Sequence, residues 1–252
     1  ALTLLIGADE SWARVQREGV LRVGMDASYP PFELVDDAGR FSGLDVDLAQ
    51  ALAQRWGVRL ELVNIHFDGL YDALFARRVD LIISALPHDP LMTRDVRYSQ
   101  SYLNAGQTLV YHCAALGPRT ADELTAASAR PARVAVELGS EAHQTLRLLA
   151  RDRALNVTIM PEREMEDATA RLLAGEAEAL LCDRVCALGQ AAAHPELCAS
   201  PALLTDEPYV IAAGFGAPQL ISQVDAALVA WRADGALAAL EQRWLAAPAR
   251  RP

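Results

Sequence analysis

The sequence contains no lysine, because all 23 basic residues in its 252 positions are arginine. Schiff-base enzymes, pyridoxal phosphate enzymes and phosphate-loop proteins each need a lysine amine, so these classes are excluded. The Gly-x-Ser-x-Gly and His-Glu-x-x-His motifs of common hydrolases are also absent. No apolar run approaches the length of about 18 residues that predicts a transmembrane helix.

Positive charge is scarce relative to negative charge, and the net charge is −10. With no basic run, the chain is not expected to bind nucleic acid or an acidic membrane surface. Residues 1–8 lack the basic flank and the length of an intact signal sequence, so we interpret them as a trimmed start. The hydrophobic fraction of 52% against 22% charged residues predicts a packed globular chain of one or two domains.

The apolar pattern alternates between strand and helix periods in the first half of the chain. Residues 60–63 and 79–83 are predicted strands, and residues 46–56 and 69–75 are predicted helices, the first with Trp56 facing inward. Such strand–helix–strand units predict a parallel sheet that is covered on both faces.

The pattern restarts after Pro118, with a new segment opening at Asp122, which indicates a second lobe. The strands predicted from there on are 133–137, 157–160, 179–182 and 209–213, and the helices are 141–150, 163–174, 219–232 and 235–244.

Candidate binding residues follow the predicted strands, at the carboxyl ends where open α/β sheets place ligands. They are Ser84 and the pair Gly139-Ser140, which is either an ordinary helix N-cap or a site for an anion or polar oxygen. The rigid loop Tyr29-Pro30-Pro31-Phe32 is either a stacking wall or a core plug.

The four cysteines allow two interpretations. Cys182, Cys186, His194 and Cys198 have a composition that zinc accepts, but their spacing is not a recurrent zinc pattern, so a structural role is favoured. In an oxidising compartment Cys198 would pair with Cys186 or with Cys113. Cys182 and Cys186 lie four residues apart, too far to bridge on a regular helix.

An ordered set of motifs covers nearly the whole chain and resembles the family 3 extracellular solute-binding proteins, the polar amino acid-binding components of ABC importers. The motifs occupy residues 21–26, 29–32, 43–48, 67–70, 79–84, 98–102, 139–140, 180–183 and 234–245. The resemblance implies the type II periplasmic binding protein fold, with two α/β lobes joined by crossing strands near residues 104–110 and 206–211. The first lobe would comprise residues 1–105 and 211–252, and the second residues 106–210. The lobes would close around a ligand by hinge motion.

The resemblance also implies a set of ligand-binding residues and no catalysis, cofactor or metal. Tyr29 and Phe67 would sandwich the ligand side chain, and Asp183 would receive its ammonium. The full set is Asp26, Tyr29, Phe67, Ser84, Ala85, Leu86, Met92, Gly139, Ser140, Glu141 and Asp183. The expected partners are a small-molecule ligand and an ABC permease, with the protein a monomer in the periplasm or outside the cell, with or without a lipid anchor. Export favours disulfides, and antiparallel crossing strands would pair Cys113 with Cys198.

The sequence departs from the family where an arginine normally grips the ligand carboxylate, six residues before Tyr98. Met92 occupies that position, and Arg94 would point about 200° away around a helix. Glu141 also replaces a small hydroxyl residue, and Pro87 replaces a residue that usually makes polar contacts. With Asp26 and Asp183 the cleft would be negative, which predicts a cationic solute.

Three alternatives to this reading remain. The first is an ordinary amino acid ligand held by the Ser140 N–H and Arg94. The second is a periplasmic dehydratase that acts on prephenate or arogenate, and the third is the sensory domain of a receptor.

Overall fold

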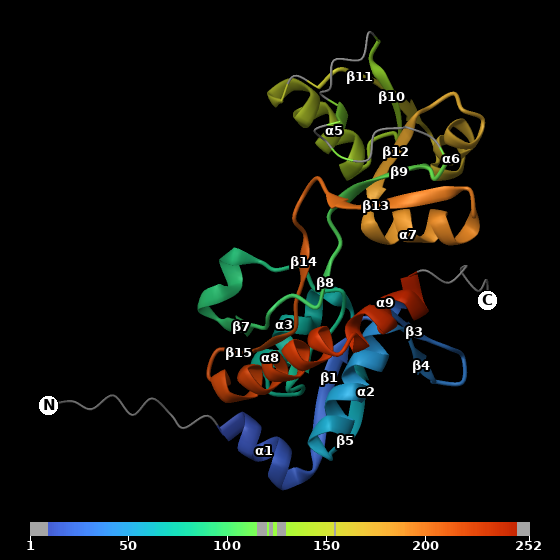
Figure 1. Ribbon diagram of the computed structural model, residues 1–252. Coiled ribbons are helices and arrows are strands. Elements are labelled where there is room, and N and C mark those ends of the chain that lie inside the picture. The colour runs from blue at the N-terminus through green and yellow to red at the C-terminus, as the bar shows by residue number, and fades with distance from the viewer. Residues whose placement is uncertain (1–9, 115–119, 121–122, 125–129, 154, 246–252) are drawn as a thin grey trace, which may run out of the picture. The chain divides into compact units, whose positions relative to one another are not determined.

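The chain divides into two compact units in the computed structural model, which describes residues 10–114, 120, 123–124, 130–153 and 155–245 (Figure 1). Unit 1 comprises Ala1–Leu103 and Pro208–Trp244, and unit 2 comprises Asn104–Glu207 and Leu245–Pro252. Residues 1–8 and the predicted start of the second lobe at Pro118 and Asp122 lie outside the described residues. None of the described helices is long and apolar enough to cross a membrane.

Unit 1 is built on a five-stranded sheet of order β5-β1-β6-β15-β7 and a three-stranded sheet of order β2-β3-β4. Its strands are β1 (Val20–Met25), β2 (Ser28–Tyr29), β3 (Glu33–Val35), β4 (Phe41–Ser42), β5 (Arg59–Asn64), β6 (Leu81–Ile82), β7 (Val96–Tyr98), β14 (Pro208–Tyr209) and β15 (Ala212–Gly214). Its helices are α1 (Glu10–Glu18), α2 (Leu44–Trp56), η1 (Phe67–Gly69), α3 (Leu70–Phe75), η2 (Pro90–Arg94), α8 (Pro218–Ala233) and α9 (Ala236–Leu245, whose last residue is assigned to unit 2).

Unit 2 repeats the strand order with its own sheet, β11-β10-β12-β9-β13. Its elements are β9 (Gln107–His112), β10 (Ala132–Glu137), α5 (Glu141–Asp152), β11 (Val157–Glu162), α6 (Met165–Leu173), β12 (Ala179–Asp183), α7 (Arg184–Ala193) and β13 (Leu197–Leu203). The chain passes between the units at β8 (Leu103–Asn104), which pairs with β14, and at residues 207–208.

Both sheets are mixed rather than fully parallel, which corrects the expectation from the sequence. In unit 1, β1 pairs in parallel with β5 and β6, whereas β15 runs antiparallel to β6 and β7. In unit 2, β10 pairs in parallel with β11 and β12, whereas β9 runs antiparallel to β12 and β13. The parallel strands at the centre of each sheet therefore end at one common edge.

The alternation of side chains along each central strand explains why both faces of the unit 2 sheet are covered. Val134 and Val136 pack into one apolar cluster with α5, and the intervening Ala135 packs into a second cluster with α6 and α7. Figure 1 shows α5 on one side of β10 and β12, and α6 on the other. The α/β fold class and two-lobed architecture expected from the sequence are confirmed.

Three local expectations differ from the structure. The predicted strand 209–213 is split, because β14 ends at Tyr209 and β15 begins at Ala212. The predicted strand 79–83 is reduced to Leu81–Ile82. Trp56 is half-buried rather than fully inward, with its ring 5.1 Å from that of Trp12 on α1, a helix that the sequence pattern did not predict.

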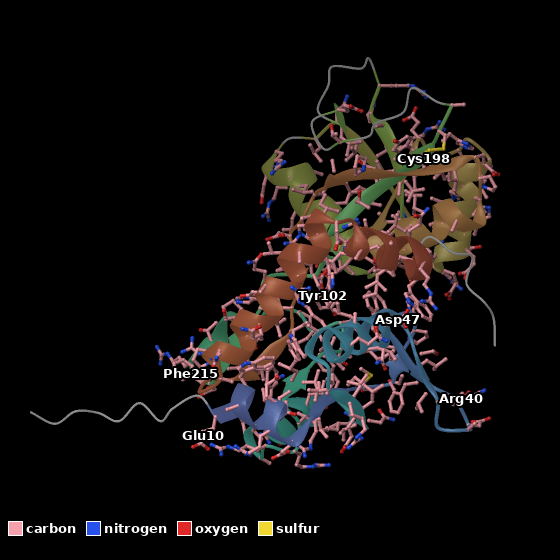
Figure 2. The ribbon with its side chains drawn as sticks, turned by 60° about the horizontal axis from the view of Figure 1, so that its bottom comes forward. Glu10, Arg40, Asp47, Tyr102, Cys198 and Phe215 are labelled. Atoms are coloured by element: carbon pink, nitrogen blue, oxygen red, sulfur yellow. A yellow bond between two sulfur atoms is a disulfide. The ribbon has the colours of Figure 1, made fainter. Side chains whose placement is uncertain are left out.

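The predicted disulfide joins Cys113 to Cys198 and appears as the yellow bond beside the Cys198 label in Figure 2. Its cause is the antiparallel ladder of β9 and β13, in which Cys198 lies opposite Tyr111, two residues before Cys113. Cys182 and Cys186 are free thiols. Because Cys198 is oxidised, the four-residue zinc set considered from the sequence lacks one of its thiols.

Candidate functional site

The sheet edge of unit 1 gathers four of the predicted ligand-binding residues. Asp26 follows β1 and Ser84 follows β6, and the Asp26 N–H donates to the Ser84 Oγ at 3.0 Å. The Asp26 carboxylate accepts from the Phe67 N–H at 2.9 Å and from the Ser28 hydroxyl at 2.6 Å. Adjacent parallel strands bring their carboxyl ends together, so Asp26, Phe67, Ser84 and Ala85 lie at one edge of the sheet, where Ser84 and Ala85 are buried.

Two aromatic side chains on unit 1 remain accessible. Tyr29 is 52% exposed and Phe67 is 41% exposed. The Tyr29 ring stacks on Phe32 at 5.6 Å, and Phe32 is completely buried against Tyr209. Phe32 is therefore the core plug that the sequence allowed, whereas the role of the exposed Tyr29 as a stacking wall stays a prediction.

A buried network of acids lies beneath this edge. The Ser84 hydroxyl donates to Glu33 Oε1 at 2.8 Å, and the Ala85 N–H donates to Asp45 Oδ2 at 2.5 Å. The Tyr102 hydroxyl donates to the same Asp45 oxygen at 3.0 Å. Glu33 and Asp45 have no exposed surface, so the polar edge of unit 1 rests on two fully buried carboxyl groups.

Burial is the main electrostatic influence on these acids. It raises the pKa of Glu33 to about 10, with the neighbouring Asp45 acting in the same direction. Burial also raises the pKa of Asp45 to about 6, against the hydrogen bonds from Ala85 and Tyr102 that favour its ionised form. Burial and the charge of Asp45 therefore both favour the protonated form of Glu33.

The position of the missing family arginine is apolar in the structure as well as in the sequence. Met92 lies in η2 and packs against the apolar cluster that contains Leu86, whose side chain is 1% exposed. Arg94 lies at the end of the same 3₁₀ helix, about 240° further around its axis, and is exposed. Leu86 and Met92 thus present core-facing side chains, and any contact of Leu86 with a ligand would use its backbone.

The sheet edge of unit 2 is formed by two helix N-caps. Ser140 follows β10 and its Oγ accepts from the His143 N–H at 3.1 Å. Asp183 ends β12 and its Oδ1 accepts from the Cys186 N–H at 2.9 Å. Gly139 has a φ of 84°, a backbone conformation that favours glycine, and this turn carries the chain from β10 into α5. The N-cap interpretation of Gly139-Ser140 is confirmed.

Glu207 joins the acids of this edge and was missed by the sequence reasoning. Burial raises the pKa of its carboxyl, and the nearby charges of Glu141 and Asp183 raise it further. Its N–H donates to the Asn104 side chain at 3.0 Å, which fixes this end of the second crossing segment within unit 2. Glu141 and Asp183 therefore lie close enough to Glu207 for their charges to act on its carboxyl group.

A cavity of about 330 Å³ opens elsewhere on unit 1, lined by His88, Arg97, Tyr98 and Phe215 among others. None of the predicted ligand-binding residues lines this cavity. The Arg97 guanidinium lies 4.6 Å from the centre of the Phe215 ring. We do not assign the cavity to the candidate site.

The buried acids left a signal in the sequence that was read differently. Asp45 is an acid in the first turn of α2, where a negative charge is favourable, yet it occupies the same helical face as Leu48, Ala49 and Leu52. An acid at an apolar position of the helical repeat is a candidate for burial. Glu33 and Glu207 lack a comparable signal, because their burial depends on tertiary packing.

The chain shows clear similarity to known binding proteins. It is 28% identical over 239 residues to the L-cystine-binding protein TcyJ of Escherichia coli (strain K12), covering 93% of this chain and 85% of that protein. It is 28% identical over 235 residues to the L-arginine-binding protein of Pseudomonas aeruginosa, covering 89% and 87%.

Two solved structures of ancestral proteins resemble the fold. An ancestral cationic amino acid solute-binding protein has a TM-score of 0.68 at 29% identity, covering 92% of this chain and 98% of that one. An ancestral cyclohexadienyl dehydratase has a TM-score of 0.79 at 24% identity, covering 95% and 97%, a likeness that shows the fold alone. Residues 21–247 match the family described as bacterial extracellular solute-binding proteins, family 3. With the match extending over both units, the chain belongs to the bacterial extracellular solute-binding proteins, family 3.

Proposed function

We propose that this protein binds a cationic amino acid or a related small cation and delivers it to an ABC importer. The observation that carries the proposal is the group of three acids at the unit 2 edge, Glu141, Asp183 and Glu207. Burial and the charges of Glu141 and Asp183 raise the pKa of Glu207, and a bound cation would favour its ionised form by pairing with it. The names of the arginine-binding relative and of the ancestral cationic amino acid-binding protein support the same class of ligand.

Unit 1 would supply the remaining recognition. Tyr29 and Phe67 offer exposed aromatic faces, which attract cations and flat guanidinium groups. Asp26 adds a carboxylate at the same edge, although two of its hydrogen bonds are already made within unit 1. Met92 offers no charge to an acidic ligand where the family arginine would stand, so acidic amino acids are disfavoured.

Calorimetric titration with a ligand panel tests this function. The panel contains L-arginine, glutamate, neutral amino acids, a polyamine and a quaternary amine, and we expect the cationic members to bind and glutamate not to bind. Glu207→Gln should weaken binding of the cation about tenfold, as expected when a charge-assisted hydrogen bond of about 1.5 kcal/mol is lost. Glu196→Gln is the matched control, because Glu196 is an exposed acid of the same unit.

The same panel contains the outcomes that would overturn the proposal. Tight binding of glutamate would contradict the acidic site, and an equal effect of the Glu207 and Glu196 substitutions would remove Glu207 from it. Turnover of prephenate or arogenate would show an enzyme in place of a transport protein. Mass spectrometry of small molecules released from the purified protein would identify the natural ligand directly.

A further inference from the structure

Two buried carboxyl oxygens of unit 1 have no conventional hydrogen-bond donor. They are Glu33 Oε2 and Asp45 Oδ1, and each belongs to a side chain with no exposed surface. The other oxygen of each group is occupied, because Glu33 Oε1 accepts from Ser84 and Asp45 Oδ2 accepts from Ala85 and Tyr102. Leaving two buried acceptors unsatisfied would be costly in a native structure.

One proton would satisfy both oxygens. The two side chains lie within hydrogen-bond reach of each other, and a carboxylic acid at Glu33 can donate to the carboxylate of Asp45. Asp45 is the better site for the negative charge, because it receives the Ala85 N–H and the Tyr102 hydroxyl. The raised pKa of Glu33 agrees with this assignment.

We propose that Glu33 and Asp45 share one proton and act as positioning residues that hold the loop Ser84–Ala85 in place. Each acid contacts one residue of this loop, Glu33 through the Ser84 hydroxyl and Asp45 through the Ala85 N–H. Ala85 has a φ of 41°, a conformation that costs a non-glycine residue free energy and needs support from its surroundings. The proton thus fixes both a side chain and a strained backbone at the candidate ligand edge.

The surroundings of the pair contain further titratable groups. The charge of Asp26, in the loop after β1, raises the pKa of Glu33, and the hydrogen bond from Tyr102, in the segment before β8, lowers the pKa of Asp45. Tyr209 of β14 raises the pKa of Tyr102. Burial raises the pKa of Tyr102 well above its usual value, so this hydroxyl stays a donor throughout the range in which the carboxyl pair titrates.

The first test compares the wild-type protein with Glu33→Gln, whose amide can accept from Ser84 and donate to Asp45 without titrating. At pH values above the usual pKa of glutamate, folding of the wild-type protein should take up one proton. Each rise of one pH unit should therefore lower its folding equilibrium constant up to tenfold relative to that of Glu33→Gln. The melting temperature of the wild-type protein minus that of Glu33→Gln should therefore fall steadily between pH 5 and pH 9. Glu61→Gln, an exposed acid on β5, should give a constant difference.

The second test observes the proton directly. Infrared spectra of the folded wild-type protein at pH 8 should contain the carbonyl band of a protonated carboxyl group, and this band should be absent in Glu33→Gln and present in Glu61→Gln. Absence of the band in the wild-type protein, or a melting difference that does not change with pH, would overturn the shared proton.

The third test asks whether the pair holds the loop. Hydrogen exchange of the Ala85 amide should accelerate at least tenfold in Glu33→Ala and return toward the wild-type rate in Glu33→Gln. Unchanged exchange in Glu33→Ala would overturn the positioning role, and this readout needs no ligand.

The link to ligand binding rests on the proposed function. L-Arginine is the probe, and its affinity should fall in Glu33→Ala and be retained in Glu33→Gln. If the wild-type protein binds no arginine, the proposed function fails while the exchange and infrared results still decide the role of the pair. If L-arginine binds equally well to both variants, ligand binding does not depend on the Glu33–Asp45 pair, and the link to binding is overturned.

Discussion

The two units share one strand order but stabilise it with different residues. Every aromatic residue except Tyr111 lies in unit 1, whereas all four cysteines lie in unit 2. Unit 1 fills its interior with large side chains such as Phe32 and adds buried acids, while the apolar clusters of unit 2 consist of aliphatic side chains, alanines and cysteine sulfur. The same topology therefore tolerates two kinds of core, with the disulfide present in the unit that lacks aromatic bulk.

The sheet edges differ in the same way. In unit 2 the polar side chains Ser140 and Asp183 are fixed locally, each capping the helix that it precedes. In unit 1, Ser84 and Ala85 are held by hydrogen bonds to buried acids, Glu33 of β3 and Asp45 of α2. A helix cap can be predicted from the adjacent residues in the sequence, whereas a hydrogen bond from an element distant in the sequence cannot.

The largest expected effect is on unit 2 and comes from removing the disulfide. The bond joins cysteines 85 residues apart, so the double substitution Cys113→Ser, Cys198→Ser should cost about 4 to 5 kcal/mol by the loop-entropy estimate. Because all four tryptophans lie in unit 1, tryptophan fluorescence reports on that unit and far-UV circular dichroism reports on both. We expect the urea transition by circular dichroism to move further than that by fluorescence.

The control for this experiment is Cys182→Ser, Cys186→Ser, which removes the free thiols and retains the bond. Equal shifts of the two signals would show that the units unfold as one cooperative structure. An unchanged transition in the double substitution would contradict any stabilising role of the disulfide.

The next largest effect is on unit 1, which is stabilised by the buried Phe32 side chain where unit 2 is stabilised by the disulfide. Phe32 is fully buried between the rings of Tyr29 and Tyr209, so Phe32→Ala should lower the free energy of unfolding by about 3 to 5 kcal/mol. Here the fluorescence transition should move at least as far as the circular dichroism transition. Phe75→Ala, which removes an aromatic ring that is 48% exposed, should have a much smaller effect. A loss confined to the circular dichroism signal would contradict the assignment of Phe32 to the unit 1 core.

The sequence predicted those parts of the fold whose causes are local. The helical spacing of Val46, Ala49 and Leu52 predicted α2, and Gly57 ends this helix in the left-handed conformation that favours glycine. The antiparallel pairing of β15 with β6 and β7 and the break between Tyr209 and Ala212 were not predicted, because pairing direction depends on distant partners.

The candidate site shows the same division. Ser84 was predicted from its position after a strand and Asp26 from the family resemblance, and the structure brings them into hydrogen-bond contact. Glu33, Tyr102 and Glu207 were not predicted, because their roles come from side chains far away in the sequence. Whether the predicted residues bind a ligand stays a prediction.

A smaller effect would separate capping from charge at the unit 2 edge. Asp183→Asn keeps an oxygen that can cap α7 and removes the negative charge, so stability should change by less than about 0.5 kcal/mol while affinity for L-arginine falls. Ser140→Ala removes the cap of α5 and should cost about 1 kcal/mol. Thermal unfolding and calorimetry measure the two quantities on the same samples. A clear loss of stability in Asp183→Asn with unchanged affinity for L-arginine would show that Asp183 has only a structural role.

The smallest expected effect is that of Arg94→Ala. Arg94 is exposed at the end of η2, and its neighbour Met92 points into the apolar cluster of unit 1, so this segment presents an aliphatic side chain where the family arginine would stand. If the ligand is recognised mainly by acids and aromatic faces, Arg94→Ala should change the affinity for L-arginine by less than about twofold, because an exposed charge contributes little. Arg77→Ala, at an exposed arginine outside the predicted set, provides the comparison in the same unit. A tenfold or larger loss in Arg94→Ala alone would show that the carboxylate grip has moved two residues along the chain. The ligand would then be an amino acid whose carboxylate is needed for binding.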